Sequence, residues 1–206
     1  MNLAGEPVVP VVAADVFMSR DADILDEIGS PGVALAIWQR SPEKAFQDWI
    51  NQLNKNDLPE LRTVVPVHLV EAAVAAACET VSLAPCAQRD VLASDVAALS
   101  QIMAKVLDIR QVRIRLDVAD EVMCPKFHID NVPARLLCTY RGKGTDYVPA
   151  GFEDEPKRIR QLKPGAVGLF RGALWNSEEA TGIKHRSPAV APEEGSRLLL
   201  VIDPVA

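Results

Sequence analysis

The spacing of apolar residues along the chain changes near residue 110 from a helical to an alternating pattern. This change constrains the fold more than any other feature. The stretch that begins after Pro85 and runs to about Leu107 carries an apolar stripe with helical spacing. The stripe comprises Val91, Leu92, Val96, Leu99, Ile102, Met103 and Val106. From Gln111 to Val118, apolar and polar residues alternate strictly, which predicts a strand with one buried face. The chain is therefore expected to form helices first and a β-rich core second.

Shorter segments on both sides of this change fit the same division. Ser41-Pro42-Glu43 is a helix start signal, and a second alanine-rich helix is expected from Leu69 to Leu83. Strands are expected at 33–38, 135–140, 166–170 and 197–202. Because no helix separates the later strands, the fold class is α+β with an antiparallel sandwich or barrel. Residues 1–110 would form a mainly helical region with one or two strands, and 111–206 the β-rich core of one integrated domain.

Composition excludes several classes of function. The 206 residues are 49% hydrophobic and carry a net charge of −6, which suits a packed core. Residues 124–206 hold 12 basic against 10 acidic side chains, which suits an anionic small molecule. No basic stripe with interleaved aromatics indicates nucleic acid, and no apolar run is long enough for a membrane span. The N-terminus lacks the pattern of a signal peptide, so the expected location is the cytoplasm.

One pattern points to a chemistry. His128-Ile129-Asp130 is followed 57 residues later by His185 and then by Arg197. On an extended strand, residues i and i+2 point the same way, so imidazole and carboxylate converge on one ion. A distant histidine then completes the facial triad that holds Fe(II) with coordination positions left open.

Other interpretations of these residues stay open. The tripeptide alone also fits a surface histidine beside an aspartate in an ordinary hydrogen bond. Cys124 and Cys138 flank it, and thiolates near an imidazole favour zinc over iron, so both cysteines are alternative zinc ligands. Free cysteine is also commonly a small buried apolar residue.

Three segments after the tripeptide resemble those of the Fe(II)/2-oxoglutarate-dependent oxygenases. The strand Gln161 to Phe170 contains their Pro-Gly-x-x-x-x-Phe pattern, and Lys184 to Pro188 resembles their distal-histidine segment. Ser196 to Asp203 resembles the strand whose arginine grips the co-substrate, with Arg197 lying 12 residues beyond His185. The match covers residues 124–203. The whole chain also resembles an uncharacterised bacterial family of unknown function with the His-x-Asp and His-Arg-Ser-Pro motifs, which tends to accompany metal-homeostasis genes.

The resemblance implies a double-stranded β-helix (a jelly-roll or cupin-like core) with the N-terminal helices packed on it. It implies His128, Asp130 and His185 as metal ligands, and Arg197 with Tyr140 as the residues that bind the carboxylate of 2-oxoglutarate. It implies no catalytic residue beyond the metal ligands. Weaker candidates for the substrate pocket are Arg135, Arg186, Trp175 and Asn176.

The expected function is therefore that of an oxidoreductase, a metal-dependent dioxygenase that hydroxylates an unknown substrate. Its cofactor would be Fe(II), with zinc as the alternative, and 2-oxoglutarate would be the co-substrate. The competing hypothesis is a non-catalytic zinc- or metal-binding protein with a cupin-like fold, acting in metal homeostasis. A third hypothesis keeps the fold as an interaction module that binds no metal.

Overall fold

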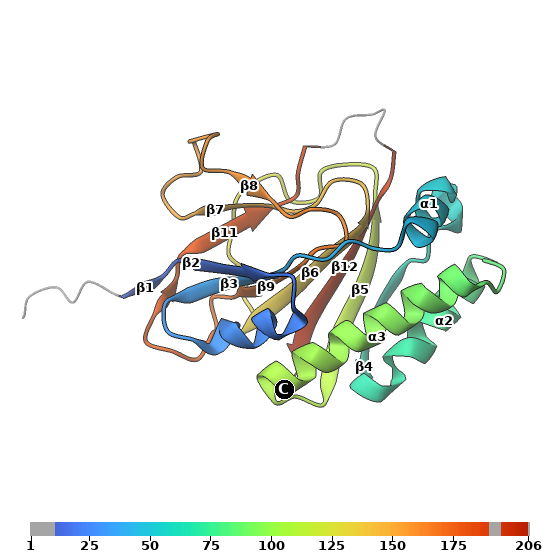
Figure 1. Cartoon of the computed structure of the whole chain (residues 1–206), viewed down its shortest axis with the longest axis horizontal. Coiled ribbons are helices and arrows are strands. Elements are labelled where there is room, and N and C mark those ends of the chain that lie inside the picture. The colour runs from blue at the N-terminus through green and yellow to red at the C-terminus, as the bar shows by residue number, and fades with distance from the viewer. Residues whose placement is uncertain (1–10, 190–194, 206) are drawn as a thin grey trace, which may run out of the picture.

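A seven-stranded sheet forms the centre of the computed structural model, which describes residues 11–189 and 195–205 (Figure 1). Its strand order is β2-β3-β9-β6-β12-β5-β4, and every neighbouring pair is antiparallel except the parallel pair β2–β3. The strands are β2 (Asp15–Ser19), β3 (Val33–Trp38), β4 (Leu61–Pro66), β5 (Gln111–Ala119), β6 (Ala134–Arg141), β9 (Val167–Arg171) and β12 (Arg197–Val205).

Two smaller sheets accompany the large one. The antiparallel three-stranded sheet has the order β11-β7-β8, with β7 at Asp146–Pro149, β8 at Arg160–Gln161 and β11 at Ile183–Arg186. A short parallel pair joins β1 (Val12–Ala13) to β10 (Ala180–Thr181).

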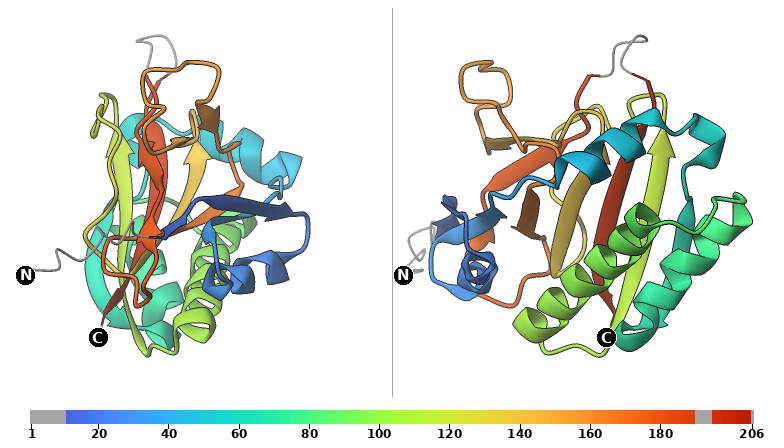
Figure 2. Two further views of the ribbon diagram at one scale, coloured as in Figure 1. Left: turned by 90° about the vertical axis from the view of Figure 1, so that its left-hand side faces the viewer. Right: turned by 45° about the vertical axis from the view of Figure 1, so that its right-hand side comes forward.

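The helices lie on one face of the large sheet, as both views in Figure 2 show. The α-helices are α1 (Lys44–Gln52), α2 (Val70–Thr80) and α3 (Ala87–Leu107). Short 3-10 helices are η1 (Ala22–Gly29), η2 (Lys55–Asp57) and η3 (Val67–Leu69). Helix α3 ends where Asp108 takes a left-handed backbone conformation, with φ 51°, and the chain turns into β5.

Alternation along the strands produces two separate cores. Leu116 of β5, Leu136 of β6 and Leu200 of β12 point toward the helices and pack with Leu92 and Met103 of α3. On the other face, Leu137, Leu199 and Val201 pack with Tyr147 and Ile183 of the three-stranded sheet. Among the described residues, this second core contains none from β4 or β5. The hydrophobic packing beneath the three-stranded sheet therefore does not extend to β4 and β5.

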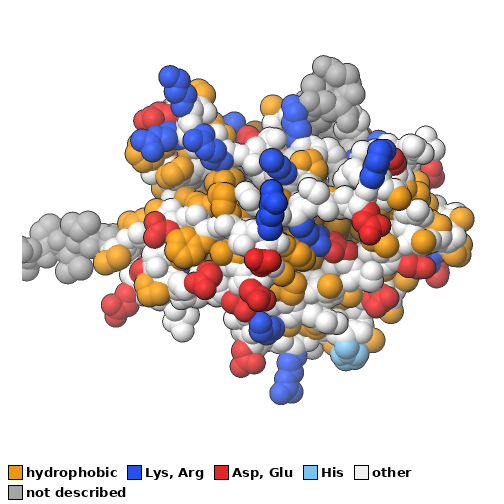
Figure 3. Space-filling model, viewed as in Figure 1, with side chains coloured by type: hydrophobic (Ala, Val, Ile, Leu, Met, Phe, Trp, Pro, Cys, Tyr) orange, Lys and Arg blue, Asp and Glu red, His pale blue; other side chains and the backbone are white. Residues whose placement is uncertain are grey.

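The expected α+β class with a large, mostly antiparallel sheet is confirmed. The region before residue 110 differs from expectation, because it contributes β1 to β4 rather than one or two strands. His128-Ile129-Asp130 also differs, because it lies in a loop where only His128 forms a β-bridge. No helix of the described residues is both long and apolar enough to cross a bilayer. The helix-covered face shows basic, acidic and apolar side chains intermingled (Figure 3).

Candidate metal centre

Two segments of the chain bring His128, Asp130 and His185 together. His185 lies on β11, and His128 and Asp130 lie in the loop between β5 and β6. The backbone amides of His128 and His185 each donate to the other's carbonyl oxygen, at 3.0 Å. One potential ligand atom from each of the three side chains lies within 4.8 Å of the other two. The local β-bridge therefore positions the two imidazoles, and the extended step from 128 to 130 adds the carboxylate.

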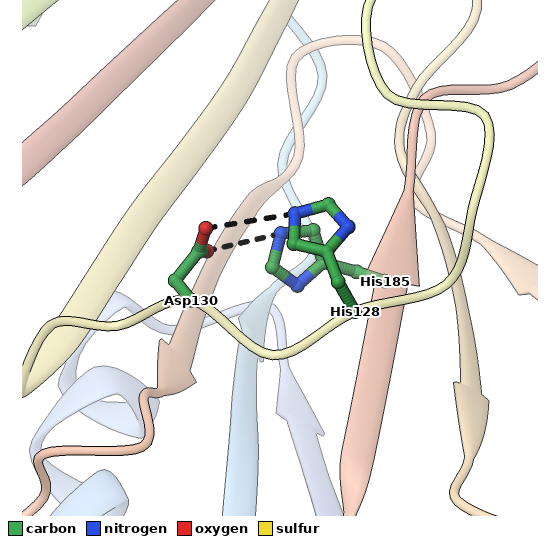
Figure 4. Close-up of side chains that lie close together, drawn as sticks. All are labelled: His128, Asp130 and His185. Carbon is green, nitrogen blue, oxygen red and sulfur yellow. Dashed lines mark ion pairs between the residues drawn. The ribbon is translucent and has the colours of Figure 1, made fainter.

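The carboxylate of Asp130 faces both imidazole rings (Figure 4). Its Oδ1 lies 3.6 Å from Nε2 of His128, and its Oδ2 lies 3.1 Å from Nε2 of His185. The two ring centroids are 4.6 Å apart. Asp130 and His185 are buried, whereas the side chain of His128 is 34% exposed. The three groups thus converge beneath the surface with one side toward solvent.

Neighbouring groups fix the orientation of each histidine. Nδ1 of His128 lies 2.9 Å from the carbonyl oxygen of Lys126, an atom that only accepts hydrogen bonds. A proton on Nδ1 satisfies this contact, and Nε2 of the same ring faces Asp130. The ring of Phe170 packs against His185 with centroids 4.8 Å apart. Both rings therefore present Nε2 to the same point.

Asp130 is held from its other side. Arg135 forms ion pairs with Asp130 and with Asp203 of β12, where the Arg135 Nε to Asp203 Oδ1 distance is 2.6 Å. Burial opposes ionisation of Asp130, but His185, Arg135 and His128 outweigh it and lower the pKa of the carboxyl. Asp130 is therefore a carboxylate at neutral pH.

Gly172 allows this loop to approach the sheet. A Cβ at Gly172 would overlap the carbonyl oxygen of Val132, so only glycine fits. The amide of Ala173 donates to the carbonyl oxygen of Asp130 at 2.8 Å. The end of β9 thus anchors the backbone that carries the carboxylate.

The donor set fits a divalent cation. Oδ2 of Asp130 is buried, and apart from the 3.1 Å contact with Nε2 of His185 it has no partner among the described residues, which is a costly state for a carboxylate oxygen. A cation between Asp130 and the two Nε2 atoms would satisfy it. Two imidazoles and one carboxylate accept Fe(II), Mn(II) and Zn(II), and leave coordination positions open.

Arg197 lines the same pocket as His128 and His185. It is buried at the start of β12, where Nε donates to the carbonyl oxygen of Lys143 at 2.8 Å. Its Nη2 donates to the hydroxyls of Thr139 and Thr145, both at 3.0 Å. Within the described residues no carboxylate forms an ion pair with it, and burial lowers its pKa to about 10. Arg197 is therefore a protonated, buried guanidinium beside the triad, open to an anionic ligand.

Three further predicted residues lie near the triad. Arg186 and Cys124 line the pocket, and Arg186 also pairs with Asp146, with 3.2 Å between Nε and Oδ2. Cys124 is exposed at the rim. Arg135 lines the pocket too, but its guanidinium is engaged by Asp130 and Asp203.

Tyr140 and Cys138 are a correction to the sequence-based expectation. Both point toward the helices, into the other core. The hydroxyl of Tyr140 donates to Asp95 on α3 at 2.6 Å, and Cys138 is buried beside Arg40. Even-numbered residues of β6 face the helices while Arg135 and Leu137 face the triad side, so neither Tyr140 nor Cys138 reaches the triad. Cys124 and Cys138 consequently do not share a site.

Trp175 and Asn176 are a second correction. They line a groove with Val106 and Leu107 at the end of α3, and Arg171 stacks over the Trp175 ring at 4.9 Å. The loop after β9 carries them to the helix side of the molecule, away from the pocket of the triad.

Sequence reasoning missed several residues that shape the site. Gly172 and Ala173 anchor the Asp130 loop, and Thr139 with Thr145 orient Arg197. Gly172 directly follows the strand that contains the Pro-Gly-x-x-x-x-Phe pattern, which was the one signal available. The threonines carry no sequence signal, because their role depends on how β6 and the loop before β7 meet.

The chain thus combines an α+β fold with a His-Asp-His site of the kind that binds a metal. Residues 19–203 match the family described as Protein of unknown function (DUF1826), so the chain belongs to this family. A search of curated proteins found no match.

The solved structures to which this chain shows some similarity include plant and bacterial oxygenases. Dioxygenase for auxin oxidation 1 from Arabidopsis thaliana, in a binary complex with 2-oxoglutarate, has 12% identity and a TM-score of 0.47, covering 81% of this chain and 66% of that one. The rice enzyme for auxin oxidation has 15% identity and a TM-score of 0.48, with coverages of 93% and 83%. A Pseudomonas putida prolyl-4-hydroxylase has 10% identity and a TM-score of 0.41, with coverages of 88% and 96%. These likenesses are too distant to assign an activity.

Proposed function

We propose that this protein is a metal-dependent oxygenase of the Fe(II)/2-oxoglutarate type. One observation carries the proposal: His128, Asp130 and His185 converge at a pocket that also contains the buried guanidinium of Arg197. The large sheet and the three-stranded sheet would then be the two sheets of a double-stranded β-helix. The bound iron would supply O₂ activation coupled to oxidative decarboxylation of 2-oxoglutarate.

The protein's own residues would hold and orient the reactants. His128, Asp130 and His185 would hold the metal and leave coordination positions open for ligands. Arg197 would bind the far carboxylate of 2-oxoglutarate through its fork of donors, a geometry that lysine does not reproduce. Thr139, Thr145 and the Lys143 carbonyl fix that guanidinium in advance, so little freedom is lost when the acid binds.

A turnover assay tests this function. Purified protein with Fe(II) under air should convert 2-oxoglutarate to succinate, slowly when no prime substrate is present. The His185→Ala variant should produce none, and the Tyr140→Phe variant, altered on the other face of the sheet, should match the wild type. Succinate formation at equal rates by the wild type and the His185→Ala variant would contradict the proposal, as would its absence from both.

The competing function, non-catalytic zinc binding, has one observation in its favour. Cys124 is exposed at the rim of the same pocket and would be the nearest thiol to the triad. In that case the Cys124→Ser variant would lose zinc affinity, and 2-oxoglutarate would not bind at any metal loading.

A further inference from the structure

The β4–β5 end of the large sheet carries a hollow lined by arginines, which we name the arginine groove. Its lining residues are Arg62, Thr63 and Val64 of β4, Arg113 and Arg115 of β5, Arg135 of β6 and Asp203 of β12. Four guanidinium groups therefore gather on one sheet face of a chain whose net charge is −6. Such a concentration of one sign attracts an oppositely charged ligand.

The strand register places like charges opposite one another. Arg62 of β4 is the direct cross-strand partner of Arg115 of β5, and both side chains line the groove. Like charges in this position repel and destabilise a sheet. An anion bound between them would convert that repulsion into attraction.

The carboxylates nearby neutralise the groove only in part: Asp117 and Asp203, the latter the cross-strand partner of Arg113, stand against four arginines. Asp117 is shared by Arg62 and Arg115, with N–O distances of 3.6 and 3.5 Å that are too long for hydrogen bonds. Arg113 has no hydrogen-bond or ion-pair partner among the residues that the structure describes. Asp203 pairs with Arg135, at 2.6 Å from its Nε. The guanidinium groups of Arg62, Arg113 and Arg115 therefore keep donors available.

The groove adjoins the triad pocket. Arg115 and Arg135 line both hollows, and Arg135 also contacts Asp130 of the triad. None of the described residues that line the groove is aromatic, so these residues offer no stacking surface for single-stranded nucleic acid. Its lining fits the oxyanion end of a small molecule whose remainder extends toward the triad.

We propose that the arginine groove binds the charged end of the prime substrate, a small molecule that bears a phosphate ester or at least two carboxylates. Arg62, Arg113 and Arg115 provide forked donors that match both kinds of oxyanion. That the bound molecule is a substrate rests on the proposed function. The binding of its oxyanion does not, because the groove binds it without metal or 2-oxoglutarate.

Calorimetric titration of the full-length protein, with and without Mn(II), tests the groove directly. The probes are inorganic phosphate and tricarballylate, which separate a phosphate-bearing substrate from a polycarboxylate. The preferred probe should bind at least ten times more weakly to the Arg62→Gln/Arg113→Gln double variant. Both side chains are exposed, so their replacement leaves the core intact. The matched control is Arg158→Gln, an exposed arginine on the loop after β7, which should bind the probe like the wild type.

The outcomes are distinct from those of the turnover assay. Binding that is lost in the double variant and kept in Arg158→Gln supports the groove, even if the protein forms no succinate. Absence of binding for both probes, or equal affinity in the wild type and the double variant, overturns the proposal even if 2-oxoglutarate is consumed.

Discussion

The two faces of the large sheet use polar groups in opposite ways. On the helix side, Arg40 donates to both oxygens of Asp95, at 2.5 and 2.6 Å, and Tyr140 donates to the same carboxylate. On the other side, the only contact of the buried Asp130 Oδ2 within the described residues is Nε2 of His185 at 3.1 Å, and Arg197 has no carboxylate partner among those residues. A fully hydrogen-bonded network stabilises the fold, whereas unpaired buried polar groups are costly, and a bound ligand would remove that cost. The following predictions test this difference.

The largest effect is expected from Asp130→Ala. Removing the carboxylate takes away one of three ligands and leaves Arg135 without one of its partners. We expect affinity for Mn(II) to fall at least about 100-fold, measured by competition with a chelating dye. Asp95→Ala, the matched change on the helix side, should leave Mn(II) affinity unchanged. Equal metal affinity in wild type and Asp130→Ala would contradict the assignment of the triad.

A somewhat smaller effect is expected from Arg197→Gln. Loss of a buried charge that faces an anionic ligand costs about 2–5 kcal/mol, so 2-oxoglutarate should bind at least about 30-fold more weakly. Calorimetric titration in the presence of Mn(II) measures this, and Mn(II) affinity itself should stay within threefold. Arg197→Lys should fail to restore binding, because lysine lacks the forked donors. Retained 2-oxoglutarate affinity in both variants would rule out Arg197 as the carboxylate site.

Cys124 and Cys138 should differ in reactivity, because they lie on opposite sides of the large sheet. Cys124 is exposed, whereas Cys138 is buried among the helices and its pKa is raised to about 11. The thiolate is the reactive form, so iodoacetamide should modify native Cys124 at least about tenfold faster than Cys138. Peptide mass spectrometry over time measures both rates. Faster modification of Cys138 would contradict its burial between β6 and the helices.

The smallest effect is expected from Tyr140→Phe. It removes one buried hydrogen bond to Asp95, which should lower the free energy of unfolding by about 1 kcal/mol in urea denaturation. Binding of Mn(II) and 2-oxoglutarate should not change, because the hydroxyl lies on the helix side of β6. A variant with wild-type stability and weakened 2-oxoglutarate binding would place Tyr140 in the site after all.

The convergence of His128, Asp130 and His185 was predictable from sequence. The i and i+2 spacing and the order of the motifs predict it correctly, even though His128 and Asp130 lie in a loop rather than on a strand. The face of Tyr140 was not predictable. Leu136 and Leu137 of β6 are both apolar because cores lie on both sides of the strand, so alternation gives no signal.

Other features depended on tertiary structure. Strand β4 was missed because Leu61–Pro66 is an edge strand that ends in proline, which resembles a loop in sequence. The arginine groove was missed for a different reason, the pairing of two distant strands. Arg62 and Arg115 meet only through the β4–β5 register, which no local pattern encodes.

The most direct test of the account is the dependence of 2-oxoglutarate binding on the metal. If the triad and Arg197 form one site, the acid is held at both ends, by the metal and by the guanidinium. The dissociation constant of 2-oxoglutarate, measured anaerobically, should then be at least tenfold lower with Mn(II) than without it, and this gain should vanish in Asp130→Ala. Equal affinity with and without metal, or no binding in either case, would contradict the account.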